Sequence, residues 1–304
     1  MAQRSRVFAV VNQKGGVGKT TTAVNLAASF AVCERPTLLV DLDGQANATS
    51  AFGAVPADAG HVYHALLGRC EMKDALLTTE LSHLHLLPSG RDLYGAEIEL
   101  VETESREHHL ERGLADLRDA YELILIDCPP SLGILTLNAL CAADAVVIPL
   151  QAEYYALEGL AGLLETVDLV RQKLNPGLRL EGILLTMTDL RNTLSRQVES
   201  EVRGHFGEQV FRTMIPRNVR LSEAPSHGRP VVLYDAQSRG AVAYLQLAEE
   251  ILERTGLKRA PVLPDSLRSD APDGESPIGD PPQSAPLESE TPVQSDTESG
   301  GGDG

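Results

Sequence analysis

The chain has 304 residues, enough for one large domain or two ordinary ones. Its net charge of −17 would by itself argue against a nucleic-acid partner, but the charge is uneven: ten acidic residues and only two basic ones follow residue 258. Only 4% of the residues are aromatic and tryptophan is absent, so the core must be aliphatic, as in a parallel sheet that is buried on both faces.

Residues 7 to about 257 alternate short aliphatic runs with longer amphipathic segments. This pattern is typical of βαβ units and predicts an α/β fold, a mostly parallel sheet with helices on both faces. The predicted strands are Val7–Val11, Thr37–Leu42, Leu84–Leu87, Leu123–Ile126, Ala145–Leu150 and Leu180–Thr186. The predicted helices include Thr20–Ala31, Glu107–Asp119, Leu157–Lys173, Leu194–His205 and a last one near Gly240–Arg254. No long apolar run precedes Asn12, so we expect neither a signal peptide nor a membrane span there.

A glycine-rich loop, NQKGGVGKTTT, joins the first predicted strand to the first predicted helix, which is the context that a P-loop requires. Its glycines let backbone N–H groups approach phosphate oxygens, and the helix N-terminus adds partial positive charge. Lys19 would pair with the β- and γ-phosphates, and the hydroxyl of Thr20 would bind Mg²⁺. The predicted ATP-binding residues of this loop are Lys14, Gly15, Gly16, Val17, Gly18, Lys19, Thr20 and Thr21.

The loop departs from the usual P-loop pattern, because Gln13 stands where the first glycine belongs and an additional lysine, Lys14, follows it. With this lysine, KGGVGKTT (14–21) resembles the deviant Walker A box of the superfamily that contains ParA, MinD and the nitrogenase iron protein. The resemblance implies a P-loop NTPase fold. It also implies an ATPase in which Lys14 reaches across a dimer interface to the partner's nucleotide, where it would act electrostatically as an arginine finger does.

Carboxylates follow two further predicted strands, at the sheet edge where ligands bind in open α/β folds. The segment DLDGQAN resembles the family's D-x-D-P-Q-x-N box, with Gly44 in place of the common proline and Ala46 in place of the common glycine. These replacements are expected to alter the stiffness of the loop. The resemblance implies that Asp43 orients the attacking water, and the alternative is a helix-capping aspartate. Asp127 ends the strand LILID, as expected of a Walker B residue that holds Mg²⁺ through water.

Three segments of the distal half also look like ParA/Soj sequence, and the resemblance spans roughly residues 5–257. They are QAEYYALEGL (151–160), GILLTMTDLRN (182–192) and MIPRNVRLSEAPSHGRP (214–230). The resemblance implies that the loop with Pro216 and Asn218 contacts the adenine.

Seven arginines and five acidic residues lie between positions 188 and 230, a small positive excess in an acidic chain. The resemblance implies that arginines of this region bind DNA without sequence preference, through phosphate contacts that need charge rather than base readout. The predicted DNA-binding residues are Arg191, Arg217 and Arg220.

Together these motifs predict a ParA/Soj-type partitioning ATPase with ATP and Mg²⁺ as cofactors. The resemblance implies an ATP-dependent homodimer in the cytoplasm that associates with the nucleoid. It would bind non-specific DNA and be released when a ParB-type centromere-binding protein stimulates hydrolysis, which would drive chromosome or plasmid segregation.

Two other functions compete with partitioning. A MinD-like membrane-associated positioning ATPase would need a basic amphipathic C-terminal helix, whereas the end of this chain is acidic and rich in proline. A metabolic P-loop ligase or synthetase would need a polar substrate pocket, which we do not find in the sequence. We therefore predict one ATPase domain over residues 1–258 and a disordered tail over residues 259–304 that binds no membrane.

Overall fold

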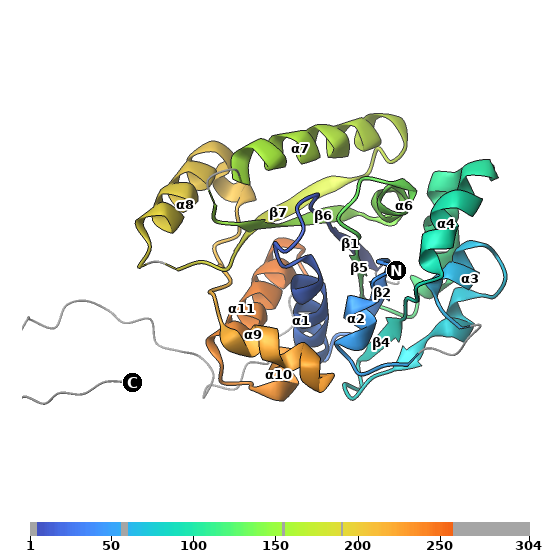
Figure 1. The fold of residues 1–304 in the computed structure, drawn as a ribbon, viewed down its shortest axis with the longest axis horizontal. Helices are drawn as coiled ribbons and strands as arrows, with labels where there is room; N and C mark the ends of the chain where they lie inside the picture. The colour runs from blue at the N-terminus through green and yellow to red at the C-terminus, as the bar shows by residue number, and fades with distance from the viewer. Residues whose placement is uncertain (1–4, 56–59, 154–155, 190, 258–304) are drawn as a thin grey trace, which may run out of the picture. The chain divides into compact units, whose positions relative to one another are not determined.

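The computed structural model describes residues 5–55, 60–153, 156–189 and 191–257 (Figure 1). The predicted tail, residues 259–304, lies outside the described residues. Within them, seven strands form one sheet in the order β3-β4-β2-β5-β1-β6-β7, in which all neighbours are parallel except the β3–β4 pair. The strands are β1 (Arg6–Val10), β2 (Thr37–Asp41), β3 (Leu77–Thr78), β4 (Leu84–Leu87), β5 (Leu123–Asp127), β6 (Ala145–Gln151) and β7 (Arg179–Thr186). The predicted α/β class and mostly parallel sheet are confirmed.

Helices cover both faces of this sheet (Figure 1). In β1, Phe8 and Val10 pack into the core formed with α1 and α11, whereas Val7 and Ala9 pack into the core formed with α6 and α7. Alternation of this kind follows from the two-residue period of a strand. The helices are α1 (Lys19–Val32), α2 (Asn47–Ser50), α3 (Val62–Leu66), α4 (Leu93–Glu99), α5 (His109–Leu114), α6 (Ile134–Ala142), α7 (Ala156–Lys173), α8 (Thr193–Phe206), α9 (Val219–Glu223), α10 (Val231–Tyr234) and α11 (Arg239–Arg254).

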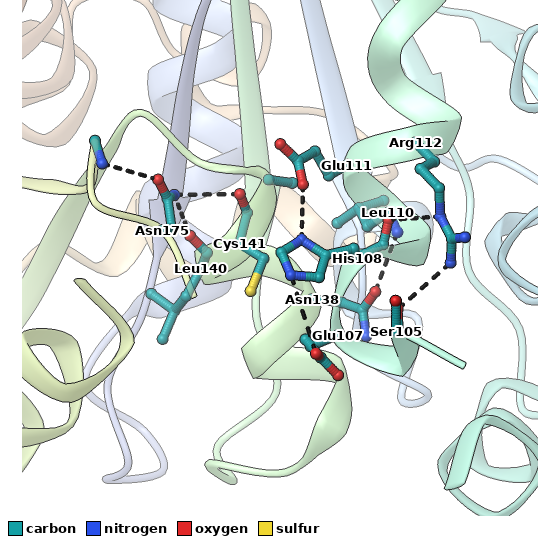
Figure 2. Close-up of polar contacts among 12 residues, drawn as sticks. Ser105, Glu107, His108, Leu110, Glu111, Arg112, Asn138, Leu140, Cys141 and Asn175 are labelled. Carbon is teal, nitrogen blue, oxygen red and sulfur yellow. Dashed lines mark hydrogen bonds and ion pairs between the residues drawn. The ribbon is translucent and has the colours of Figure 1, made fainter. Parts of the chain in front are cut away.

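The helix predicted over Glu107–Asp119 is confirmed only in part: the segment is helical from Arg106 to Leu117, but only α5 is α-helical, with a 3₁₀ turn before it at Arg106–His108 and another after it at Ala115–Leu117. Asn138 of α6 binds the start of the segment: its side chain accepts from the Leu110 N–H (Figure 2) and also donates to the Arg106 carbonyl. Near the end of α5 stands Gly113, a poor helix former, where a Cβ would lie 2.7 Å from the Met72 sulfur. Tertiary contacts therefore override the helical periodicity.

Helix α6, which follows the loop after Asp127, is fixed at its C-terminal end by one side chain. The amide of Asn175 donates to the carbonyl oxygens of Leu140 and Cys141 at 2.9 and 3.1 Å (Figure 2), and to that of Ala143 at 2.8 Å. The last carbonyls of a helix have no partner inside the helix. Asn175 supplies that partner and anchors α6 next to the sheet.

A buried carboxylate of α11 holds the segment that leads toward the distal loop at 215–218. Glu250 is 3% exposed and accepts hydrogen bonds of 2.9 Å from the backbone N–H groups of Arg212 and Thr213. The guanidinium of Arg254 also donates to it, at 2.7 Å. Burial alone would raise the pKa of Glu250, but the two backbone donors and the arginine outweigh burial and hold the pKa below its ordinary value.

We predict that Glu250→Gln lowers the free energy of unfolding at neutral pH by about 1–3 kcal/mol, because an amide cannot accept from both N–H groups and pair with Arg254. A lowered pKa means that the carboxylate stabilises the fold above the unfolded-state pKa, near 4.5, and that this contribution is lost as the pH falls through the folded-state pKa. Urea denaturation at about pH 7 and about pH 4 should therefore show a difference between wild type and variant that shrinks in acid. Glu201→Gln, at an exposed position of α8, is the matched control. A variant as stable as wild type at neutral pH would contradict this account.

Candidate nucleotide-binding site

The glycine-rich loop lies between the end of β1 and the start of α1, as the sequence predicts. Gly16 and Gly18 have φ angles of 75° and 90°, the left-handed region that glycine adopts at least cost. Gly18 immediately precedes α1, so the N–H groups of the first helical turn, which includes Thr20 and Thr21, have no partner within the helix. Such N–H groups and the positive end of the helix dipole form an anion-binding site.

Two side chains tie this loop to the ends of neighbouring strands. The hydroxyl of Thr186, the last residue of β7, donates to the Val17 carbonyl at 2.9 Å. Asn12 donates to the Pro149 carbonyl of β6 at 2.7 Å and accepts from the Lys14 N–H at 3.0 Å. The loop is therefore held in shape from two strands before any phosphate is bound. Asn12 and Thr186 were missed at the level of sequence, because nothing in the pattern shows which side chains meet the loop.

The two lysines of the loop lie in different environments. Lys19 is 7% exposed and donates from Nζ to the Lys14 carbonyl at 3.0 Å, inside its own loop. Burial lowers the pKa of Lys19, and the negative charge of Asp127 opposes that effect. The side chain of Lys14 is half exposed and pairs with Glu153 at 2.6 Å. Exposed ion pairs contribute little to stability, so Lys14 can leave Glu153 at small cost.

Asp41 and Asp127 end the adjacent strands β2 and β5 in register with each other. Asp41 accepts hydrogen bonds of 2.7 Å from both the backbone N–H and the hydroxyl of Thr49, and burial raises its pKa to about 6 against the effect of these bonds. Asp127 is fully buried, and neither of its carboxylate oxygens has a hydrogen-bond partner among the described residues. Burial, followed by the charge of Asp41, raises the pKa of Asp127 well above its ordinary value.

A buried carboxylate without a partner is costly unless a cation or donor completes its surroundings. Thr20 and Lys19 both lie close enough to Asp127 to favour its charged form. A hydroxyl and a carboxylate are ligands that Mg²⁺ accepts, and this metal usually keeps several waters. Thr20 and Asp127 therefore fit a Mg²⁺ site in which the carboxylate acts through water.

Asp43 lies in the loop after β2 and is 7% exposed. One of its carboxylate oxygens accepts from the Gln45 N–H at 3.0 Å, and its carbonyl accepts from the Ser89 hydroxyl at 2.8 Å. The alternative of a helix-capping aspartate is wrong for Asp43, since the N-cap residue of α2 is Ala46 and the side chain that accepts from an N–H of its first turn, that of Thr49, is Asp41. Asp43 is instead fixed within a tight turn after β2, close enough to Lys19 of the P-loop for the two charges to interact.

A cavity of about 260 Å³ opens beside the P-loop and contains the predicted adenine-contact residues. Gly18 and Thr21 form one wall, and Pro216, Arg217 and Asn218 contribute to the other. The side-chain oxygen of Asn218 caps α9 by accepting from the Arg220 N–H at 2.8 Å, so only its amide N–H groups could donate to a ligand.

Met187 and Tyr244 also line this cavity, and sequence reasoning missed both. Met187 follows the end of β7 and has a φ of 51°, an uncommon conformation for a residue with a Cβ. Strained residues of this kind cluster at ligand sites. The signal that could have found Met187 is its position directly after a strand that ends at the sheet edge used by the P-loop.

The three predicted DNA-binding arginines are exposed, and two of them pair with acids of the same region. Arg191 donates to both carboxylate oxygens of Asp189, at 3.0 and 3.1 Å. Arg220 pairs with Glu223 at 2.8 Å and Asp235 at 3.2 Å. Arg217 lies close enough to Asp189 for its charge to lower the pKa of that carboxyl, after the larger effect of Arg191. The arginines are therefore partly neutralised by acids that a phosphate would have to displace.

Known proteins resemble this chain over most of its length. Residues 5–180 match a family model described as an AAA domain. The chain is 56% identical over 250 residues to the chromosome partitioning protein ParA of Myxococcus xanthus, a match that covers 82% of this chain and 88% of the relative. It is 54% identical over 247 residues to the sporulation initiation inhibitor protein Soj of Bacillus subtilis, with coverages of 81% and 98%. Among solved structures, cobyrinic acid a,c-diamide synthase of Mycobacterium smegmatis with bound ADP and magnesium is 40% identical with a TM-score of 0.73, over 83% of this chain and 96% of that one.

We predict that Asp127→Asn stabilises the protein in EDTA and without nucleotide by about 1–3 kcal/mol, because an amide is cheaper to bury without a partner than a carboxylate. A raised pKa means that the wild type loses stability as the pH rises through the folded-state value, and the variant does not. The difference between them should therefore be larger at about pH 8 than at about pH 5. Denaturant unfolding measures it, and Asp119→Asn at an exposed position is the control. An Asp127→Asn protein that is less stable than wild type in EDTA would show that the carboxylate has a partner.

Proposed function

Because this chain belongs to the ParA/Soj family of chromosome-partitioning ATPases, we propose that it hydrolyses Mg²⁺·ATP as a homodimer and couples the nucleotide cycle to DNA binding. The observation that supports the dimer most directly is the contrast between the two lysines of the P-loop. Lys19 is buried inside its own loop, whereas Lys14 is half exposed and held only by a surface ion pair. A lysine in that position is available to the nucleotide of a second subunit.

The residues of the site then take distinct parts in phosphoryl transfer to water. Backbone N–H groups of Gly15–Thr21 and the ammonium group of Lys19 bind the phosphates, and the cavity at Pro216 and Asn218 accepts the adenine. Thr20, and Asp127 through water, would hold Mg²⁺, which would supply positive charge to offset the negative charge of the phosphates. The structural relative at 40% identity was crystallised with ADP and magnesium, which supports these cofactors.

Two further groups act on the transition state. Asp43, fixed in its turn by the Gln45 N–H, orients the attacking water. Lys14 of the partner subunit would stabilise the charge that develops on the transferred phosphoryl group, the part that an arginine finger plays in other P-loop enzymes. Hydrolysis is therefore expected to be slow until two subunits with ATP have met.

ATP would also control DNA binding. One subunit offers only a few exposed arginines, among them Arg191, Arg217 and Arg220, and acids partly neutralise them. Two subunits double the number of phosphate contacts, and the affinity for non-specific DNA rises accordingly. We expect a ParB-type protein to stimulate hydrolysis and so release the dimer from the nucleoid, where the cytoplasmic protein would gather.

Neither alternative function gains support. No helix of the described residues is long and apolar enough to span a bilayer, and the residues that a MinD-like membrane anchor would require fall in 258–304, outside them. The synthase noted above is 40% identical to this chain, whereas the partitioning protein ParA of Myxococcus xanthus is 56% identical to this chain. The domain boundary at residue 258 and the disorder of the tail stay predictions.

We predict that Lys14→Ala lowers the rate of ATP hydrolysis by about a hundredfold or more while ATP still binds. Lys19→Ala should lose ATP binding itself, because it removes the buried cation of the phosphate loop. Phosphate release and fluorescent-ATP binding, measured with DNA and at several protein concentrations, separate the two effects. Lys73→Ala removes an exposed lysine that likewise pairs with a glutamate, and should change neither. Hydrolysis by Lys14→Ala at the wild-type rate would contradict the proposal that Lys14 acts on the nucleotide of the partner subunit.

We predict that Arg191→Ala and Arg220→Ala each weaken ATP-dependent binding to DNA of any sequence. Each removes about two phosphate contacts per dimer, so a plot of log K against log salt should flatten by about 1.8. Asp189→Asn, which removes the carboxylate that competes for Arg191, should strengthen binding. Arg171→Ala breaks a comparable exposed ion pair on α7 and serves as the control. Titrations by fluorescence anisotropy test this prediction. If neither arginine substitution changes the affinity for DNA, the DNA-binding surface does not include Arg191 and Arg220.

A further inference from the structure

The aromatic ring of Tyr94 covers Gly44, the residue that directly follows Asp43. Tyr94 lies in the first turn of α4. A Cβ added at Gly44 would lie 2.9, 3.0 and 3.1 Å from three carbon atoms of the ring. Gly44 is buried, while Tyr94 is 47% exposed, so the ring is in contact with the loop on one side and with solvent on the other.

Glycine suits position 44 because the Tyr94 ring leaves little room for a side chain, and not because the backbone has a conformation that only glycine adopts freely. Among the described residues, the glycines with a left-handed φ do not include Gly44, so its backbone is open to any L-residue. What excludes a side chain is the ring, because Cβ atoms do not approach other carbons to 2.9 Å. A side chain at position 44 would therefore force the Tyr94 ring to move, and a proline there would collide with the ring in its present position.

The loop that contains Gly44 has little rigidity of its own. Glycine has the greatest backbone freedom of any residue, whereas a proline at this position would fix φ. Ala46, two residues on, has a φ of 53°, which is unfavourable for a residue with a Cβ. A contact from outside the loop would therefore add to the restraint that the hydrogen bonds of the turn provide.

Tyr94 provides that contact at two neighbouring residues. Besides covering Gly44, its hydroxyl accepts a hydrogen bond from the side-chain amide of Gln45. The backbone N–H of Gln45 in turn donates to the Asp43 carboxylate at 3.0 Å. One ring on α4 thus restrains both residues that follow Asp43, including the donor that orients its carboxylate.

We propose that Tyr94 is a positioning residue for Asp43: it restrains the Gly44–Gln45 loop from outside. The inference rests on the proposed function, in which Asp43 orients the attacking water. Tyr94 is not among the residues that line the cavity at Pro216 and Asn218. Its removal should therefore affect turnover and leave ATP binding intact.

Four variants test the pair. Tyr94→Ala should lower kcat about tenfold, since it frees the backbone of about one residue, with the KM for ATP changed less than about twofold. Tyr94→Phe keeps the ring and loses only the bond to Gln45, so kcat should fall about two- to threefold. Gly44→Pro alone should lower kcat at least as much as Tyr94→Ala, because the two rings collide. Gly44→Pro combined with Tyr94→Ala should restore kcat to within about threefold of wild type, since proline then stiffens an unobstructed loop.

Ile98→Ala is the matched control, because Ile98 lies one turn along α4 and is 76% exposed. Thermal melting of each variant identifies a general loss of stability, which the double variant would not repair. Hydrogen exchange at the backbone N–H groups of Gln45 and Ala46, both bonded to Asp43, measures how often the loop opens and does not depend on ATP hydrolysis. Exchange there should be faster in Tyr94→Ala and slower again in the double variant.

The outcomes separate this inference from the proposed function. Wild-type kcat and wild-type exchange in Tyr94→Ala would overturn the positioning role even if the protein is an active ATPase. A fall in kcat that the double variant deepens would also overturn it. If the wild-type protein hydrolyses no ATP, the proposed function fails, and the exchange of Gln45 and Ala46 still decides whether Tyr94 restrains the loop.

Discussion

The site must combine an anion-binding loop with buried carboxylates at one edge of a sheet. Parallel strands bring Asp41 and Asp127 side by side at their carboxyl ends, and β1 delivers the P-loop to the same edge. Asp127 has no hydrogen-bond partner among the described residues, and Lys19 is the buried cation near it. Phosphates added to this site would meet carboxylates that already repel one another, so the arrangement is consistent with nucleotide binding only together with a divalent cation.

The need to hold an anion-binding loop next to carboxylates that repel one another explains why hydrogen bonds fix so many residues around the site. Thr186 and Asn12 hold the P-loop, Thr49 holds Asp41, and the turn with Gln45 holds Asp43. Groups fixed in advance do not have to be reorganised during a reaction, and this preorganisation is the main source of electrostatic catalysis. Lys14 stands apart, since a surface ion pair restrains it weakly. That difference matches a residue that changes partner during the nucleotide cycle.

Sequence patterns predicted the features of the structure that depend on residues close together in the chain. The aliphatic runs placed six strands to within one or two residues, and the glycines with Lys19 and Thr20 placed the P-loop. Sequence patterns failed where contacts between residues that are far apart in the chain determine the local structure. The segment expected as one helix over Glu107–Asp119 is α-helical only in α5, where Asn138 binds the Leu110 N–H, and helices as short as α2 or α9 are too brief for a period to show. The reason for Gly44 is a ring fifty residues later in the chain, which no local pattern reveals.

The central claim is that ATP joins two copies of this chain through Lys14, and the mass of the protein in solution tests it most directly. Asp43→Ala, which should bind ATP and turn it over slowly, is passed through a sizing column with light scattering in Mg²⁺·ATP and in Mg²⁺·ADP. The account predicts twice the mass of one chain in ATP, the mass of one chain in ADP, and a loss of the ATP-dependent species when Lys14 is also changed to alanine. The mass of one chain in both nucleotides, at protein concentrations where ATP is shown to be bound, would contradict it.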